Sequence, residues 1–268
     1  MSQNFLARYL TALILIPVVI VTMYTGGIIW SALVAALAIL GGLEFYGLAH
    51  GRAIQGYAAI GMPAIILLLA GFHLAEPLLT AAAVIGVVIA ATPTVLVRHA
   101  SPWRIITTLA GIVYVGLPAA FLIGMRQLDN GFLWLVVIVA ITWGTDTFAY
   151  FGGRVWGRRK LAPRLSPNKT LEGAVVGLAG GFLPALLFLF VTGSVTTASL
   201  VMIAFGPIVA ILGDLLESAI KRFFKVKDSH LAGLNIIPGH GGVLDRVDAL
   251  LMVVMICYPY ILLTGIAS

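Results

Sequence analysis

The chain has 268 residues, of which 61% are hydrophobic and only 10% are charged, and its mean hydropathy is +1.09. A water-soluble domain needs more charged surface, so this composition excludes an ordinary soluble protein and indicates a chain that crosses a membrane several times. The net charge of +6 requires no nucleic-acid partner, because a basic face toward anionic lipid headgroups and cytosolic anions explains it.

Long apolar runs predict about nine membrane helices. A bilayer core about 30 Å thick needs roughly 20 apolar residues per helix. The predicted spans lie near residues 10–24, 28–48, 56–73, 77–97, 105–124, 131–151, 172–192, 196–220 and 245–265. The expected fold is therefore all-α, that of a polytopic integral membrane protein.

The basic residues predict the orientation of these helices. Nine spans with a cytoplasmic N-terminus place fifteen of the sixteen Lys and Arg residues on the cytoplasmic side and only Arg126 outside. Cytoplasmic loops of membrane proteins carry such an excess of basic residues. The C-terminus is then expected to be external.

Two long polar loops distinguish the second half of the chain. We expect residues 1–125 to form N-terminal membrane helices, and residues 126–268 to form C-terminal helices with cytoplasmic loops at 152–171 and 221–244. Loops of this length are usually functional or disordered. Their aromatic and aliphatic residues favour function.

Several carboxylates fall inside predicted spans, where ionisable residues are expensive and are often functional. They are Glu44, Asp146, Asp214 and Glu217. For Glu44, a functional role and structural hydrogen bonding are equal alternatives.

The segment around Asp214 has a helical spacing of polar groups. Asp214, Ser218, Lys221 and Lys225 recur so that one helix face would carry an acid, a hydroxyl and two ammonium groups. A solvated helix end explains the two lysines but not Asp214, which lies deeper in the span.

The segment PGHGGVLDRVD, residues 238–248, joins a glycine-rich loop to the last span. Asp245 and Asp248 are three residues apart and share a helix face, although the helix dipole alone also favours acids there. Glycines allow main-chain N–H groups to approach an anion closely. Hard oxygen ligands from Asp214, Asp245 and Asp248 predict Mg²⁺. His240 is expected to donate a hydrogen bond and not to bind the metal.

The segment SPNKTLEG, residues 166–173, predicts a helix start. Ser166 is the expected N-cap, Pro167 the first helical residue, and Lys169 and Thr170 lie where an anion would bind. Taken alone, the segment is better explained as a plain capped helix start, and the case for an anion site rests on the basic cluster around it and on the acids of the second loop.

Two strings, SAIKRFFKVKDS and IIPGHGGVLDRVD, closely resemble the signature of the bacterial phosphatidate cytidylyltransferase (CDP-diacylglycerol synthase) family. The string WGTDTFAYFGGRVWGRRKLAPRLSPNKTLEG is similar to the family's central motif. The resemblance covers most of the chain and is strongest in residues 142–250. One departure is HLAGLNII, between Ser229 and Pro238, which is longer than the usual link in the family.

The resemblance implies transfer of the cytidylyl group of CTP to phosphatidic acid, which gives CDP-diacylglycerol and pyrophosphate in phospholipid biosynthesis. It also implies a location in the bacterial cytoplasmic (inner) membrane, an active site that faces the cytoplasm, and a homodimer. A second cation such as K⁺ beside the Mg²⁺ is implied as well.

The roles of individual residues follow from the resemblance and from the chemistry above. The expected catalytic residues are Asp214, Ser218, Lys221, Arg222, Asp245 and Asp248, and the three aspartates are the expected metal ligands. The expected substrate-binding residues are Asp146, Asn168, Lys169, Thr170, Lys227, Asp228, His240, Gly241, Gly242 and Arg246.

Two other functional classes are alternatives. A transporter would be expected to show matched interrupted helices in its two halves. A lipid-phosphate transferase of the CDP-alcohol phosphotransferase type would carry a D-G-x-x-A-R string, which the sequence lacks.

Overall fold

The computed structural model describes residues 3–50, 58–76, 78, 80–82, 84–87, 89, 102–226 and 242–267. Nearly all of these residues are helical, and six helices among them are long and apolar enough to cross a membrane. The predicted helical, multi-pass membrane fold is confirmed to this extent. Two more apolar helices, Leu15–Thr25 and Ile60–His73, are shorter. The predicted span near 77–97 lies largely outside the described residues.

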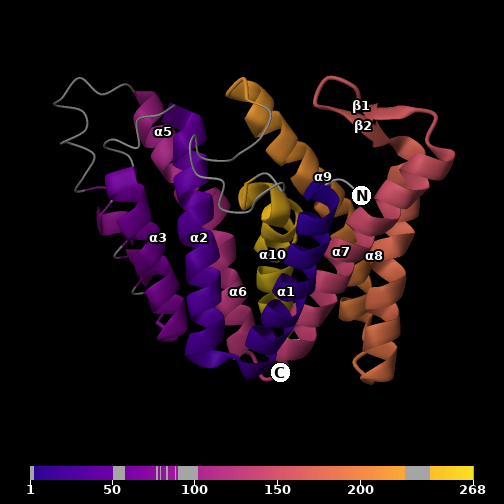
Figure 1. Cartoon of the computed structure of the whole chain (residues 1–268). Helices are drawn as coiled ribbons and strands as arrows, with labels where there is room; N and C mark the ends of the chain where they lie inside the picture. The colour runs from indigo at the N-terminus through magenta and orange to yellow at the C-terminus, as the bar shows by residue number, and fades with distance from the viewer. Residues whose placement is uncertain are drawn as a thin grey trace. The chain divides into compact units, whose positions relative to one another are not determined.

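The first of two compact units comprises residues 1–127 and 226–246. Helix α5, the π-helical turn η1 and helix α6 follow one another directly and together provide the candidate span Ile105–Gln127. The elements of this unit are α1 (Gln3–Thr25), α2 (Gly27–His50), α3 (Ala58–His73), α5 (Pro102–Gly111), η1 (Ile112–Gly116) and α6 (Leu117–Gln127) (Figure 1).

Tyr46 of α2 is a packing centre of the first unit. Its side chain is only 1% exposed, and its hydroxyl donates a hydrogen bond to the carbonyl oxygen of Thr108 at 3.0 Å. The ring lies against Gly61 of α3 and Gly111 of α5, where any Cβ would collide with it. The buried hydroxyl thus has the partner that a polar group needs away from water.

The break between α1 and α2 is held by Arg126 of α6. Gly26 and Gly27 have φ angles of 66° and 53°, which glycine adopts without strain. Arg126 donates from Nε to the carbonyl oxygen of Met23 at 2.7 Å and from Nη2 to that of Tyr24 at 2.9 Å. These bonds satisfy carbonyls that the end of a helix leaves without intrahelical partners. The single basic residue predicted outside the cytoplasmic face therefore has a structural role.

The second unit comprises residues 128–225 and 247–268. Helix α10 begins within the first unit and continues into the second. The elements are α7 (Gly131–Trp156), β1 (Lys160–Ala162), β2 (Ser166–Thr170), α8 (Leu171–Val191), α9 (Thr197–Phe223) and α10 (Leu244–Thr264). Strands β1 and β2 form an antiparallel hairpin that connects α7 to α8 (Figure 1). This hairpin is the one departure from helical structure among the described elements.

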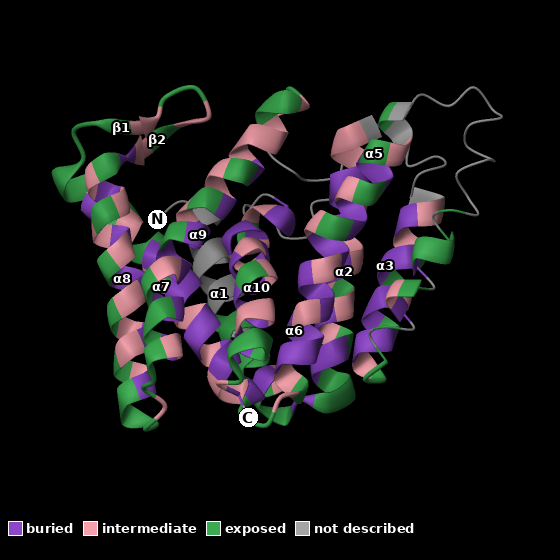
Figure 2. Cartoon of the chain, turned by 180° about the vertical axis from the view of Figure 1, so that it is seen from behind, coloured by how far each residue is buried: buried purple, intermediate pink, exposed green. Residues whose placement is uncertain are grey.

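Helices α7 and α8 pack along a face of small residues. The buried residues of α8 are Gly173, Gly177, Gly180, Gly181, Ala185 and Leu189. Most of the remaining residues of α8 are exposed or intermediate (Figure 2). A Cβ at Gly177 would lie 2.8 Å from both the Cβ of Ala149 and the carbonyl oxygen of Thr145 on α7. Small residues of this kind let the backbones of membrane helices approach closely.

Two local predictions are wrong. Ser166 does not cap a helix, because residues 166–170 pair with β1 as strand β2. The N-cap of α8 is Thr170, whose hydroxyl oxygen accepts the N–H of Gly173 at 3.1 Å. Lys225 does not extend the predicted polar face of α9, because that helix ends at Phe223 and Lys225 has a φ of 57°.

Candidate active site

A cavity of about 580 Å³ lies in the second unit, within the size range of small-molecule sites. Helix α7 lines it with residues at positions 145, 146, 149, 150, 153 and 154, the spacing of one helix face. The hairpin, α8 and α9 provide the remaining lining. Five of the predicted site residues line this cavity, namely Asp146, Asn168, Lys169, Thr170 and Asp214.

The hairpin that carries Asn168 and Lys169 is tied to the first turn of α8. The carboxylate of Glu172 accepts the backbone N–H of Arg158 at 3.0 Å and that of Arg159 at 3.1 Å. The N–H of Leu171 donates in turn to the carbonyl oxygen of Arg159 at 2.9 Å. Sequence reasoning missed Glu172, although an acid in the first turn of a helix beside a basic loop was an available signal.

Three carboxylates of the second unit come together, those of Asp214, Glu217 and Asp248. One oxygen from each lies within 4.8 Å of the others. Asp214 and Glu217 are three residues apart on α9 and so share a face, and Asp248 belongs to α10. Glu217 and Asp248 are buried, at 3% and 9% exposed. A group of hard oxygen donors such as this one fits a divalent cation such as Mg²⁺.

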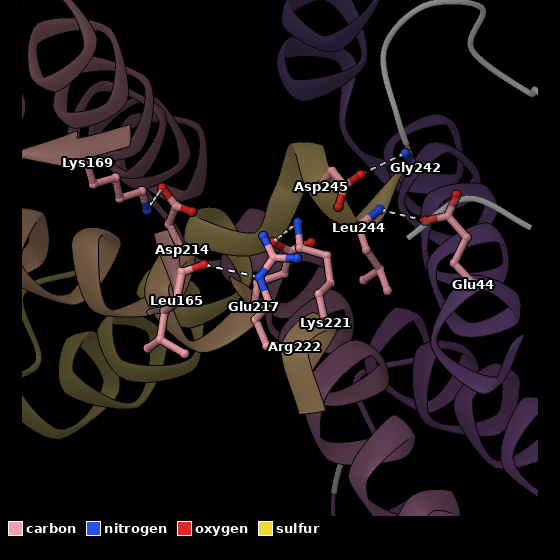
Figure 3. A network of polar contacts seen from close by, with 10 residues as sticks. All are labelled: Glu44, Leu165, Lys169, Asp214, Glu217, Lys221, Arg222, Gly242, Leu244 and Asp245. Atoms are coloured by element: carbon pink, nitrogen blue, oxygen red, sulfur yellow. Dashed lines mark hydrogen bonds and ion pairs between the residues drawn. The ribbon is translucent and has the colours of Figure 1, made fainter. Parts of the chain in front are cut away.

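Two lysines contact this carboxylate group. Lys169 of β2 forms an ion pair with Asp214, and Lys221 forms one with Glu217 at 2.5 Å (Figure 3). Three acids therefore face two ammonium groups, which leaves a formal charge of −1 for a cation to neutralise. Because Asp214 also lines the cavity, the group of three carboxylates lies at the edge of the cavity.

Other predicted residues of the second unit lie near the end of α9. Arg222 is exposed and donates from Nε to the carbonyl oxygen of Leu165, at 3.4 Å, which links the helix to the hairpin (Figure 3). Ser218 lies on α9 with intermediate exposure.

Asp245 and Gly242 belong to the first unit. The Oδ2 atom of Asp245 accepts the backbone N–H of Gly242 at 3.0 Å (Figure 3). Of the three aspartates predicted as metal ligands, the structure brings together Asp214 and Asp248, and Glu217 is the third acid beside them. Arg246 is exposed in the first turn of α10. The predicted site residues Lys227, Asp228, His240 and Gly241 lie outside the described residues.

Known proteins are similar in sequence to this chain over most of its length. A phosphatidate cytidylyltransferase of Bacillus subtilis (strain 168) is 39% identical over 181 residues, which are 66% of this chain and 65% of the relative. Proteins of the same name from Thermotoga maritima and Pseudomonas aeruginosa are both 32% identical, over 239 and 255 residues respectively. Those alignments cover 84% and 91% of this chain, and 85% and 92% of the relatives.

The Bacillus subtilis alignment thus spans slightly less than two thirds of that relative, and the other two span most of theirs. A family model described as "Cytidylyltransferase family" matches residues 6–264, nearly the whole chain. The chain therefore belongs to the cytidylyltransferase family, whose members are nucleotidyltransferase enzymes.

Proposed function

We propose that this protein transfers the cytidylyl group of CTP to phosphatidic acid and so forms CDP-diacylglycerol and pyrophosphate for phospholipid biosynthesis. Membership of the cytidylyltransferase family and the shared name of three relatives support this reaction. The observation that carries the proposal is the position of Asp214, which belongs to the carboxylate group and lines the cavity beside Lys169. A cation and a phosphorylated substrate can therefore bind next to each other.

The proposed reaction brings two anions together. A phosphate oxygen of phosphatidic acid bonds to the α-phosphorus of CTP while the bond to the leaving pyrophosphate breaks, so the protein needs no covalent nucleophile. A Mg²⁺ ion held by Asp214, Glu217 and Asp248 would supply positive charge for the phosphate oxygens. Lys169 and Asn168, which line the cavity, would bind the triphosphate and stabilise charge on the leaving group.

The other predicted roles complete the proposal. Lys221, Arg222 and Ser218 on α9 would contact phosphate oxygens near the carboxylate group. The remaining residues would contact the nucleotide, and they are Asp146, Thr170, Lys227, Asp228, His240, Gly241, Gly242, Asp245 and Arg246. A second cation such as K⁺ and a homodimer are part of the same proposal, on the resemblance to the family alone.

The reaction is tested with purified protein, phosphatidic acid in detergent micelles, Mg²⁺ and CTP labelled in its β- and γ-phosphates. We expect labelled pyrophosphate and CDP-diacylglycerol in equal amounts, and only when both substrates are present. A transporter would form neither product, and a CDP-alcohol phosphotransferase would consume CDP-diacylglycerol. Absence of pyrophosphate from an active, folded preparation would contradict the proposal.

We also propose nine spans in the bacterial inner membrane, with the N-terminus and the cavity on the cytoplasmic side and the C-terminus outside. The asymmetry of the basic residues supports this orientation. Helix α7 tests it well, because its 26 residues extend about 39 Å and exceed the bilayer core. Asp129 precedes this helix, Arg158 follows it, and both are exposed.

Single cysteines at these two positions should respond differently in intact cells. In a Cys257→Ala background, Asp129→Cys should react with an impermeant thiol reagent, and Arg158→Cys should react only after the membrane is opened. Cys257 is the one cysteine of the sequence and is buried, so its replacement leaves the introduced cysteine as the sole thiol without altering the exposed surface. Labelling of Arg158→Cys from outside would reverse the proposed orientation.

A further inference from the structure

Glu44 of α2 is a buried carboxylate at the start of another helix. Its side chain is 3% exposed. Oε1 accepts the backbone N–H of Val243 at 2.8 Å. Oε2 accepts that of Leu244, also at 2.8 Å (Figure 3). All three residues belong to the first unit, although about 200 positions separate Glu44 from its partners in the chain.

The packing around these hydrogen bonds is close. Gly41 lies one helical turn before Glu44, and a Cβ at that position would lie 3.4 Å from Cδ2 of Leu244. Val243 and Leu244 are each 2% exposed. Helix α2 therefore presents a small residue and a carboxylate on one face, which receives the start of α10.

The start of α10 needs hydrogen-bond acceptors, which a carboxylate can supply. The first N–H groups of a helix have no intrahelical acceptor, and within a membrane protein no bulk water replaces one. Helices usually solve this with a local Ser, Thr, Asp or Asn at the N-cap, whereas α10 is preceded by Gly242 and Val243. Glu44 supplies two charge-assisted hydrogen bonds instead, and the helix dipole favours its charge.

Asp245 extends this arrangement by one residue. Its carboxylate accepts the N–H of Gly242, so three successive N–H groups, those of residues 242 to 244, are bound by two carboxylates. The backbone of residues 242 to 244 is thus held by Glu44, which belongs to helix α2, and by Asp245, which belongs to α10 itself. A loss of Glu44 would release two of the three bonds.

We propose that Glu44 is a positioning residue that fixes the junction of the glycine-rich loop and α10, and thereby places Gly242 and Asp245 for nucleotide binding. This inference rests on the proposed cytidylyl transfer. Glu44 would touch neither substrate, because its two oxygens are engaged by the backbone of residues 243 and 244.

The test compares Glu44→Gln and Glu44→Asp with the wild type. Glutamine keeps the size of the side chain but turns one acceptor into an NH₂ donor, which faces a backbone donor. We expect Glu44→Gln to raise the KM for CTP about tenfold or more, and the KM for phosphatidic acid less than about twofold. A loss of about tenfold is the effect usually seen when a residue that orients a site from outside is removed. Glu44→Asp, which keeps the charge, should recover part of the loss.

Glu76→Gln provides a matched control, because Glu76 is an exposed acid of the same unit. It should leave both KM values unchanged. If Glu44→Gln cannot be purified, the ratio of the two KM values in Glu44→Asp decides the question. Equal losses for both substrates would mean that Glu44 only stabilises the fold and would overturn the proposal.

Two measurements separate this inference from the reaction itself. Hydrogen exchange in the peptide that contains residues 243 and 244 should be faster in Glu44→Gln than in the wild type, and unchanged exchange would contradict the hydrogen bonds. Binding of labelled CTP with Mg²⁺ and without phosphatidic acid should weaken about tenfold. A wild-type protein that binds CTP but forms no product would contradict the proposed reaction, and the binding ratio would still decide the role of Glu44.

Discussion

Asp214→Asn and Asp248→Asn should each lower the turnover of CTP by about 100-fold or more, while the protein still inserts into the membrane. Removal of a residue that only orients a metal ligand already lowers metal affinity or activity by about 10- to 100-fold. Loss of a charged ligand should therefore lower the activity by at least the larger of these factors. Asparagine keeps the shape of the side chain and removes the charge that would hold Mg²⁺ beside the cavity. The measurement is the rate of pyrophosphate release as a function of Mg²⁺ concentration.

The same assay distinguishes Glu217 from Asp245 as the third ligand. Glu217 lies with Asp214 and Asp248, so Glu217→Gln should raise the Mg²⁺ concentration needed for half-maximal rate. Asp245→Asn should act mainly on the KM for CTP, because Asp245 accepts the N–H of Gly242. Asp129→Asn is the control, since Asp129 is exposed before the start of α7. Normal rates at low Mg²⁺ in both Asp214→Asn and Asp248→Asn would refute the metal site.

Gly177→Val should destabilise the second unit severely. The Cβ alone would lie 2.8 Å from an α7 side chain and an α7 carbonyl oxygen, and valine adds two methyl groups beyond it. Overpacking of a close contact costs about 1–3 kcal/mol, and a rigid backbone neighbour puts this variant at the upper end. We expect a lower melting temperature in detergent, a low yield of folded protein and loss of activity, because α7 and α8 both line the cavity.

Gly86→Val is the matched control for this variant. Gly86 is helical, and a Cβ there would meet no atom of the described residues within 4 Å. The substitution has the same chemistry, so its melting temperature should stay close to that of the wild type. Equal melting temperatures for Gly177→Val and Gly86→Val would show that the contact between α7 and α8 contributes little to stability.

The sequence predicted the chemistry of the site better than its local geometry. The sequence predicted a functional acid at Asp214 and an anion-binding role for Lys169. In the structure the two side chains form an ion pair. Lys169 reaches this place from a strand and not from the predicted helix start. The hairpin pairs Lys160 with Thr170 and Ala162 with Ser166, and helix-capping patterns do not detect such strand pairing.

The sequence also did not show which of the carboxylates come together at the predicted metal site. A spacing of three residues puts Asp214 beside Glu217 on α9 and Asp245 beside Asp248 on α10, so helix periodicity treats the two pairs alike. Packing of one helix against another decides which acids meet, and a single sequence holds no record of that packing. The contact of Glu44 with Val243 and Leu244 was beyond prediction for the same reason.

The glycine contact between α7 and α8 also bears on how a lipid can arrive. At Gly173 a Cβ would lie 2.9 Å from the Cα of Gly153, and at Gly177 the two helices are equally close, so an acyl chain cannot pass between them. The two helices therefore form a closed wall on this side of the cavity. In the proposed reaction, phosphatidic acid would therefore enter by a different lateral route, and substitutions that widen or narrow that route should change the rate of lipid entry without changing the affinity for CTP.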